Sequence, residues 1–140
     1  MEKVKAAFGV DEALWSRWQA WFENESLWPK QTALIHSDMH AVHILIDNKA
    51  QVTGLIDWTE ALVDDPAHDF GAHLTLFGEN ALKQLIQSYQ NAGGYVWTEM
   101  FEHIVELVAT YHVAIAEFAI ESGLKEYEDM AKQMLGVENR

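Results

Sequence analysis

The sequence predicts a mainly α-helical fold that includes a small β-hairpin, an α+β arrangement. Apolar residues recur every three or four positions near both ends of the chain, and short apolar runs bounded by turn residues lie in its middle. Hydrophobic residues make up 49% of the 140 residues and charged residues 22%, which is typical of a globular protein. This length is near the usual size of one domain, so we expect a single domain over residues 1–140.

The first expected helix runs from Asp11 to about Glu25. Asp11 is a favourable N-cap, and Trp28-Pro29 ends the segment because the residue before proline avoids helical geometry. One face of this helix carries five apolar residues that we expect to lie in the core: Leu14, Trp15, Trp18, Trp21 and Phe22.

The hydrophobic period changes in the middle of the chain and again after Pro66. Short strands are expected at residues 33–35, 43–47 and 52–58. The turn at 47–51 pairs the last two as a hairpin. Helices are expected at residues 67–77, 79–92, 97–121 and 124–135. Gly93-Gly94 and Gly123 are expected to end the second and third of these helices.

The charge and composition exclude several classes of function. Nine basic residues against 22 acidic ones give a formal net charge of −13, which argues against nucleic acid and anionic membranes as partners and favours a cationic ligand. The absence of cysteine excludes disulfides, thiolate nucleophiles and Cys-ligated zinc. The N-terminus does not resemble a signal peptide, and the apolar run Val113–Ile120 is too short to cross a membrane. We therefore expect a cytoplasmic protein.

Candidate functional residues gather in the β region. His36, Asp38 and position 43 follow the spacing of a kinase catalytic loop, H-x-D-x-x-x-x-N, and Asp57 follows the expected hairpin. Phosphoryl transfer needs one aspartate to accept the hydroxyl proton and another to bind the metal. Because a hairpin returns the chain on itself, Asp38 and Asp57 are expected to face one cleft.

Two other interpretations fit the same residues. His36, Asp38 and His40 alternate, so with Asp57 they would suit Zn²⁺ or Mn²⁺ in a metal-dependent hydrolase. His36 and His40 taken singly are more often structural. Three further aspartates lie near the start of an expected helix, where negative charge is favourable, so capping and bracing are their expected roles: Asp64, Asp65 and Asp69.

The segment Leu34–Leu45 resembles the catalytic loop of the aminoglycoside and choline kinase-like phosphotransferases. Residues 54–61 and 64–69 resemble the downstream metal-binding and bracing motifs of that family. His43 in place of the usual Asn, together with Ile-Asp-Trp-Thr-Glu-Ala at 56–61, is similar to the macrolide 2′-phosphotransferase branch, as are residues 77–79 and 92–95. The resemblance extends from about Leu34 to Tyr127.

This resemblance implies the C-terminal lobe of a protein-kinase-like fold and an enzyme of antibiotic resistance. Asp38 would be the catalytic base acting on a sugar hydroxyl of a macrolide or another amino-sugar substrate. The donor would be GTP or ATP with Mg²⁺. The remaining roles are metal binding by His43 and Asp57, nucleotide contact by His43, Leu45 and Ile56, and bracing by His36, Asp65 and Asp69. The apolar residues of 97–121 are either core or a wall of the macrolide pocket: Phe101, Val105, Val108 and Phe118.

The sequence departs from the family pattern in its loop and before Leu34. Ser37 replaces Gly, and Ala41-Val42 replaces Pro-Gly, so a positive φ at either place would be strained. His43 offers nitrogen where Mg²⁺ prefers oxygen, so contact through water or phosphate is expected. No segment before Leu34 resembles the N-terminal nucleotide-binding lobe. We therefore expect a C-terminal lobe that is inactive alone and self-associates; a non-catalytic macrolide-binding module is the third interpretation.

Overall fold

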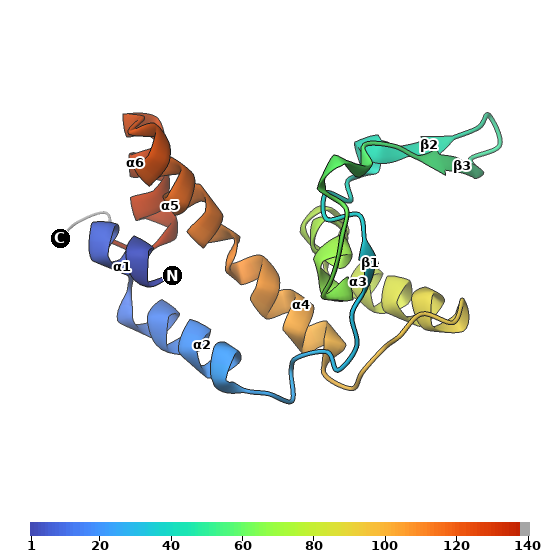
Figure 1. Cartoon of the computed structure of the whole chain (residues 1–140), viewed down its shortest axis with the longest axis horizontal. Helices are drawn as coiled ribbons and strands as arrows, with labels where there is room; N and C mark the ends of the chain where they lie inside the picture. Colours follow the sequence, from blue (N-terminus) through green and yellow to red (C-terminus); the bar gives the residue numbers. More distant parts are fainter. Residues whose placement is uncertain (138–140) are drawn as a thin grey trace. The chain divides into compact units, whose positions relative to one another are not determined.

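The computed structural model describes residues 1–137, which fall into two compact units (Figure 1). The first unit combines Met1–Glu25 with the chain from Val108 onward, and the second spans Ser26–Leu107. The fold is mainly helical with small antiparallel strand pairs, as the sequence predicts.

Four helices form the first unit: α1 (Glu2–Phe8), α2 (Glu12–Glu23), α5 (Tyr111–Ser122) and α6 (Lys125–Met134). The expected cap is confirmed, since Asp11 Oδ1 accepts hydrogen bonds from the Ala13 and Leu14 amides at 3.0 and 3.2 Å. The core residues of this unit are Val4, Val10, Trp18, Ala116, Ala119, Ala131 and Leu135. Phe22 was expected among them but is 67% exposed, because the apolar face of α2 is buried only around Trp18 and Trp21.

Helix α1 was not predicted. It is only seven residues long, and Val4, its one buried residue, packs in the core of this unit. The expected stop at Gly123 is confirmed, since this residue ends α5 in the left-handed conformation with φ 62°.

Two antiparallel strand pairs lie in the second unit. β2 (Ile44–Ile46) and β3 (Val52–Leu55) form the predicted hairpin, which projects from the rest of the unit (Figure 1). Asp47 Oδ1 accepts bonds from the Lys49 and Gln51 amides and so closes the turn. β1 (Ala33–Ile35) pairs instead with β4 (Leu62–Asp64), a strand the sequence pattern did not predict. β3 ends earlier than expected, and a 3₁₀ turn, η2 (Trp58–Glu60), follows it.

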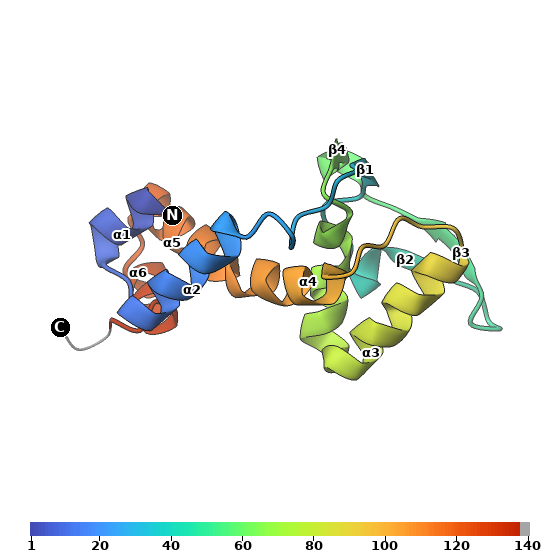
Figure 2. The ribbon, with the colours of Figure 1, turned by 90° about the horizontal axis from the view of Figure 1, so that it is seen from below.

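The helices of this unit differ from the prediction at their breaks. A 3₁₀ segment, η3 (Pro66–Phe70), precedes α3 (Gly71–Asn91), so the expected helix at 67–77 begins as 3₁₀. Gly78 interrupts α3 with φ 80° and ψ 177°, and the ribbon changes direction there (Figure 2). The helix expected at 97–121 is two helices, α4 (Met100–Ala109) and α5, separated at Thr110.

The stretch Met100–Ser122, made of α4 and α5, is long and apolar enough to cross a membrane by length and composition. That criterion is a weak indication, because core helices of proteins outside membranes also meet it. Met100, His103, Ile104 and Leu107 are buried within the fold.

Candidate active site

The imidazole of His43 lies between the two aspartates that the sequence singles out. Its Nε2 is 3.8 Å from Asp57 Oδ2, and its Nδ1 is 3.7 Å from Asp38 Oδ2. Nδ1 also lies 2.8 Å from the Asp38 carbonyl oxygen. Since a carbonyl can only accept, Nδ1 carries the proton in the neutral ring and the lone pair of Nε2 faces Asp57. The structure thus brings Asp38, His43 and Asp57 together.

The backbone around His43 and Asp57 sets the direction of their side chains. His43 ends a 3₁₀ turn, η1 (Ala41–His43), and its carbonyl accepts from the Ile56 amide at 3.0 Å, which holds the chain before Asp57 against the loop. Asp57 has φ 62°, a left-handed conformation that Asp tolerates better than most residues. Its Oδ1 accepts a bond from the Thr59 hydroxyl at 2.8 Å, so its Oδ2 is the oxygen nearest His43.

Only one of the unusual loop residues carries the strain that the sequence suggests. Ser37 has φ 69°, in the region that glycine adopts without cost. Val42 lies in η1 and is not among the non-glycine residues with positive φ in the described part of the chain. The replacement of glycine by serine is therefore strained, and the replacement at Val42 is not.

The carboxylate of Asp69 holds the backbone of the loop just before Asp38. Its two carboxylate oxygens accept bonds from the His36 and Ser37 amides, each at 2.8 Å. The buried His36 ring donates from Nε2 to the Ile56 carbonyl at 2.8 Å, and it lies 5.6 Å from the His43 ring in a stacked arrangement. These bonds place Asp38 at the end of a tightly held segment.

Leu45 and Ile56 flank this centre and are exposed, at 45% and 44%. Asp65 lies farther away, at the start of η3, where its Oδ1 accepts from the Ala67 amide. His40 is half exposed, and its Nε2 lies 3.0 Å from Asp38 Oδ1.

The arrangement does not favour the hydrolase interpretation. Within residues 1–137, no three His, Asp or Glu side chains are grouped so that they could hold a metal ion by themselves. His36 donates from Nε2 to the Ile56 carbonyl, its other nitrogen, Nδ1, is buried, and His40 Nε2 lies 3.0 Å from Asp38 Oδ1. His36, Asp38, His40 and Asp57 therefore do not converge as one ligand set.

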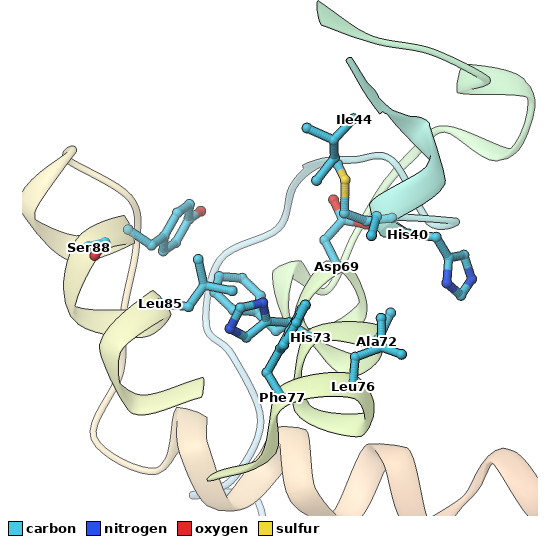
Figure 3. A pocket seen from close by; sticks show the side chains of 13 residues that line it. His40, Ile44, Asp69, Ala72, His73, Leu76, Phe77, Leu85 and Ser88 are labelled. Atoms are coloured by element: carbon cyan, nitrogen blue, oxygen red, sulfur yellow. The ribbon is translucent and has the colours of Figure 1, made fainter. Parts of the chain in front are cut away.

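A pocket of about 470 Å³ lies beside the loop (Figure 3). Its walls come from the two parts of α3 on either side of Gly78, with Ala72 and Leu76 across from Leu85 and Ser88. The loop contributes Met39, His40 and Ala41, and the other lining residues are Ile44, Asp69, Phe70, His73, Phe77 and Tyr89.

The pocket residues on α3 were missed in the sequence, because their helical period is also that of an ordinary core face. The four residues of 97–121 considered as a pocket wall do not line this pocket: Phe101, Val105, Val108 and Phe118.

Sequence comparison gives two informative relatives. An uncharacterized protein of Bacillus subtilis (strain 168), YcbJ, is 47% identical over 98% of this chain, which covers 45% of that protein. Viomycin phosphotransferase of Streptomyces vinaceus is 26% identical over 75% of the chain, covering 36% of that enzyme. The chain thus spans less than half the length of these curated relatives.

Solved structures agree with these relatives. Macrolide 2′-phosphotransferase type I has a TM-score of 0.86 and 44% identity; the match covers 96% of this chain and 44% of that enzyme. The macrolide 2′-phosphotransferase MphH from Brachybacterium faecium has a TM-score of 0.85 and 27% identity, with 99% of this chain and 46% of that one covered. Aminoglycoside 2′-phosphotransferase-IIIa, at 20% identity and a TM-score of 0.74, shares the fold.

These neighbours confirm the expected fold class, the C-terminal part of a protein-kinase-like phosphotransferase. The family model of the phosphotransferase enzyme family (APH) matches residues 1–103, about three quarters of the chain. The chain belongs to the phosphotransferase enzyme family.

Proposed function

We propose that this chain supplies the base, the metal-binding aspartate and the acceptor pocket of a macrolide 2′-phosphotransferase. One observation supports the proposal above all others: the carboxylates of Asp38 and Asp57 both approach the His43 ring, at 3.7 and 3.8 Å, beside a pocket of about 470 Å³. Such a site would place an acceptor hydroxyl and a nucleotide phosphate on opposite sides of Asp38.

In the proposed reaction, the oxygen of the sugar hydroxyl attacks the γ-phosphorus while Asp38 accepts the hydroxyl proton. The new bond is O–P, and the bond that breaks joins the γ-phosphorus to the bridging oxygen of GTP or ATP. Asp38 needs a fixed position for this step, because positioning supplies much of the rate enhancement in phosphoryl transfer. Asp69 would fix that position, because its oxygens accept hydrogen bonds from the His36 and Ser37 amides just before Asp38.

Asp57 and His43 are the residues that would hold Mg²⁺. Mg²⁺ commonly takes only one or two carboxylates from the protein and completes its shell with water and phosphate oxygens, which suits a half-exposed Asp57. His43 presents a nitrogen, so we place it near the ion through water or against a phosphate. The bound ion would neutralise charge on the transferring phosphoryl group.

The lining of the pocket favours a macrolide over a more polar acceptor. Its walls are largely apolar, with Leu76, Phe77 and Leu85 among them, and an apolar lactone ring would bury well against these side chains. The net charge of −13 would attract the amine of the amino sugar. Two of the structural neighbours are named macrolide 2′-phosphotransferases.

We propose further that the chain works with a second, nucleotide-binding half and is inactive alone. The name apolar strand surface is used here for the exposed apolar side chains on the two strand pairs and in the segment after β3: Leu34, Leu45, Ile46, Val52, Ile56, Trp58, Leu62 and Val63. An exposed apolar surface of this kind is usually covered by a partner. The neighbours are more than twice as long as the segment they share with this chain, which supports a second half as that partner.

The test is a phosphate-transfer assay on the 140-residue chain, alone and joined to the N-terminal segment of macrolide 2′-phosphotransferase type I. We expect Mg²⁺-dependent transfer from GTP or ATP to a macrolide by the joined protein and none by the chain alone. Transfer to an aminoglycoside but not to a macrolide would overturn the proposed substrate class and leave the proposed phosphate-transfer reaction in place. Macrolide binding in calorimetry without transfer by the joined protein would favour a non-catalytic binding module.

A further inference from the structure

We propose that His103, on α4, is a positioning residue that acts on the Asp38 loop through Asp65 and η3. The catalytic part of this inference depends on the function proposed above. The positional part depends only on contacts in the second unit. No kinase motif in the sequence includes His103, which lies 38 residues from Asp65 along the chain.

The pair itself is buried and tightly joined. His103 Nε2 lies 2.6 Å from Asp65 Oδ2, and the side chains of His103 and Asp65 are 0% and 9% exposed. A carboxylate can only accept here, so the imidazole donates from Nε2. Burial makes the bond costly to lose, because either group left without its partner would remain away from water.

Asp65 uses its other oxygen to fix the start of η3. Its Oδ1 accepts from the Ala67 amide at 2.8 Å, which makes Asp65 the N-cap of this 3₁₀ segment. The Asp65 amide in turn donates to Asp64 Oδ1 at 2.8 Å. The carboxylate therefore joins α4 to the first turn of η3 and fixes where that segment begins.

The far end of η3 carries the aspartate that holds the catalytic loop. Asp69 lies four residues after Asp65, and both of its oxygens accept from loop amides, those of His36 and Ser37, at 2.8 Å. Pro66, Ala67 and Phe70 of η3 are buried, so the segment between Asp65 and Asp69 is packed in the core of this unit. A shift at Asp65 would then reach Asp69 and, through it, the residue just before Asp38.

Aromatic rings fix the position of His103. Its ring centroid is 4.9 Å from that of Trp28 and 5.8 Å from that of Trp97, both at steep angles. Trp97 Nε1 donates to the Leu27 carbonyl at 2.7 Å, so the rings are themselves anchored in the segment that leads to β1. His103 is thus packed against two tryptophan rings where it donates to Asp65.

The experiment compares His103→Leu, which removes the donor, with His103→Gln, whose amide can still donate to Asp65. Ile104→Ala is the matched control, because Ile104 is fully buried on the same helix and its loss also costs stability. The first readout is the amide proton chemical shifts of His36 and Ser37 in the full chain, which report their bonds to Asp69. The second is the split between kcat and KM in the joined protein.

We expect His103→Leu to move both amide shifts upfield and to lower kcat by about tenfold or more, with KM for the macrolide unchanged. In His103→Gln the amide shifts and kcat should return most of the way to their wild-type values. Ile104→Ala should lower Tm but change neither the amide shifts nor kcat. If His103→Leu does not fold, His103→Asn, whose side chain is too short to reach Asp65, gives the same comparison.

Unchanged amide shifts in a folded His103→Leu protein would overturn the proposal, and so would a loss of Tm alone. If the joined wild-type protein transfers no phosphate, the proposed function fails. The amide shifts still test the positioning in that case.

Discussion

The Nε2 atom of His43 lies 3.8 Å from Oδ2 of Asp57, with the ring proton on the opposite nitrogen. Two electron-rich atoms therefore face each other with no proton between them in the neutral ring. This geometry is compatible with the cation site proposed above. Asp38 lies on the other side of the same ring, 3.7 Å from Nδ1.

Ser37→Gly is expected to stabilise the chain, because Ser37 has φ 69°. A non-glycine residue in this region costs about 1–2 kcal/mol, and the greater freedom of glycine in the unfolded chain offsets up to about 1 kcal/mol of that gain. We expect the free energy of unfolding to rise by about 0.5–1 kcal/mol in urea denaturation. Ser16→Gly, in the exposed face of α2, is the control and should lower it. A lower value for Ser37→Gly would contradict strain at this position.

Gly78→Ala is expected to destabilise the chain by about 1–3 kcal/mol, since its φ of 80° and ψ of 177° are accessible almost only to glycine. Apart from its chain neighbours and the adjacent helix backbone, no atom lies within 4 Å of the added Cβ, so the cost comes from the backbone conformation and not from a clash. Macrolide binding should weaken too, because the break at Gly78 sets the two walls of the pocket opposite each other. Glu79→Ala, exposed in the same helix, should change neither quantity. Equal thermal unfolding of the two variants would refute this role of Gly78.

Phe77→Ala separates binding from stability. Phe77 lines the pocket but is 61% exposed, so its removal should change the free energy of unfolding by less than about 0.5 kcal/mol. Macrolide affinity in calorimetry should fall by about 5- to 30-fold, as for a moderate contact at a binding surface. Phe118→Ala, half exposed on α5 and outside this pocket, should leave affinity unchanged. Equal affinity for wild type and Phe77→Ala would place the substrate elsewhere.

The apolar strand surface is expected to make the isolated chain self-associate. Leu34 and Val63 face each other across β1 and β4 and are 68% and 66% exposed. Replacing both with threonine keeps the strand propensity and removes apolar area, so light scattering should give a smaller mass than for the wild type. Leu124→Thr, exposed at the start of α6, should leave the mass unchanged. A monomeric wild-type chain at high concentration would disprove this expectation.

The parts of the fold predicted from sequence are those with local signals. The Asp11 cap, the β2–β3 hairpin and the stop at Gly123 each depend on residues a few positions apart. β4 was missed because three residues carry no readable alternation, and its partner, β1, lies far away in the sequence. The break at Gly78 was placed correctly, but the pocket between the two parts of α3 depends on their spatial arrangement.

The candidate site divides in the same way. The spacing of Asp38, position 43 and Asp57 is typical of a catalytic loop followed by a hairpin, so the sequence could predict that these residues lie close together. His103 offers no such pattern, because a single histidine on an apolar helix has many ordinary roles. Its 2.6 Å contact with Asp65, seen in the structure, connects it to the loop.

The most direct measurement of the central claim is kcat for phosphate transfer to a macrolide in the joined protein carrying Asp38→Asn. Asparagine keeps the size of the side chain but cannot accept the hydroxyl proton, so kcat should fall by about 10²- to 10⁴-fold with KM for the macrolide nearly unchanged. Asp129→Asn, an exposed carboxylate on α6, should retain full activity. Wild-type kcat in Asp38→Asn would contradict the assignment of Asp38 as the base.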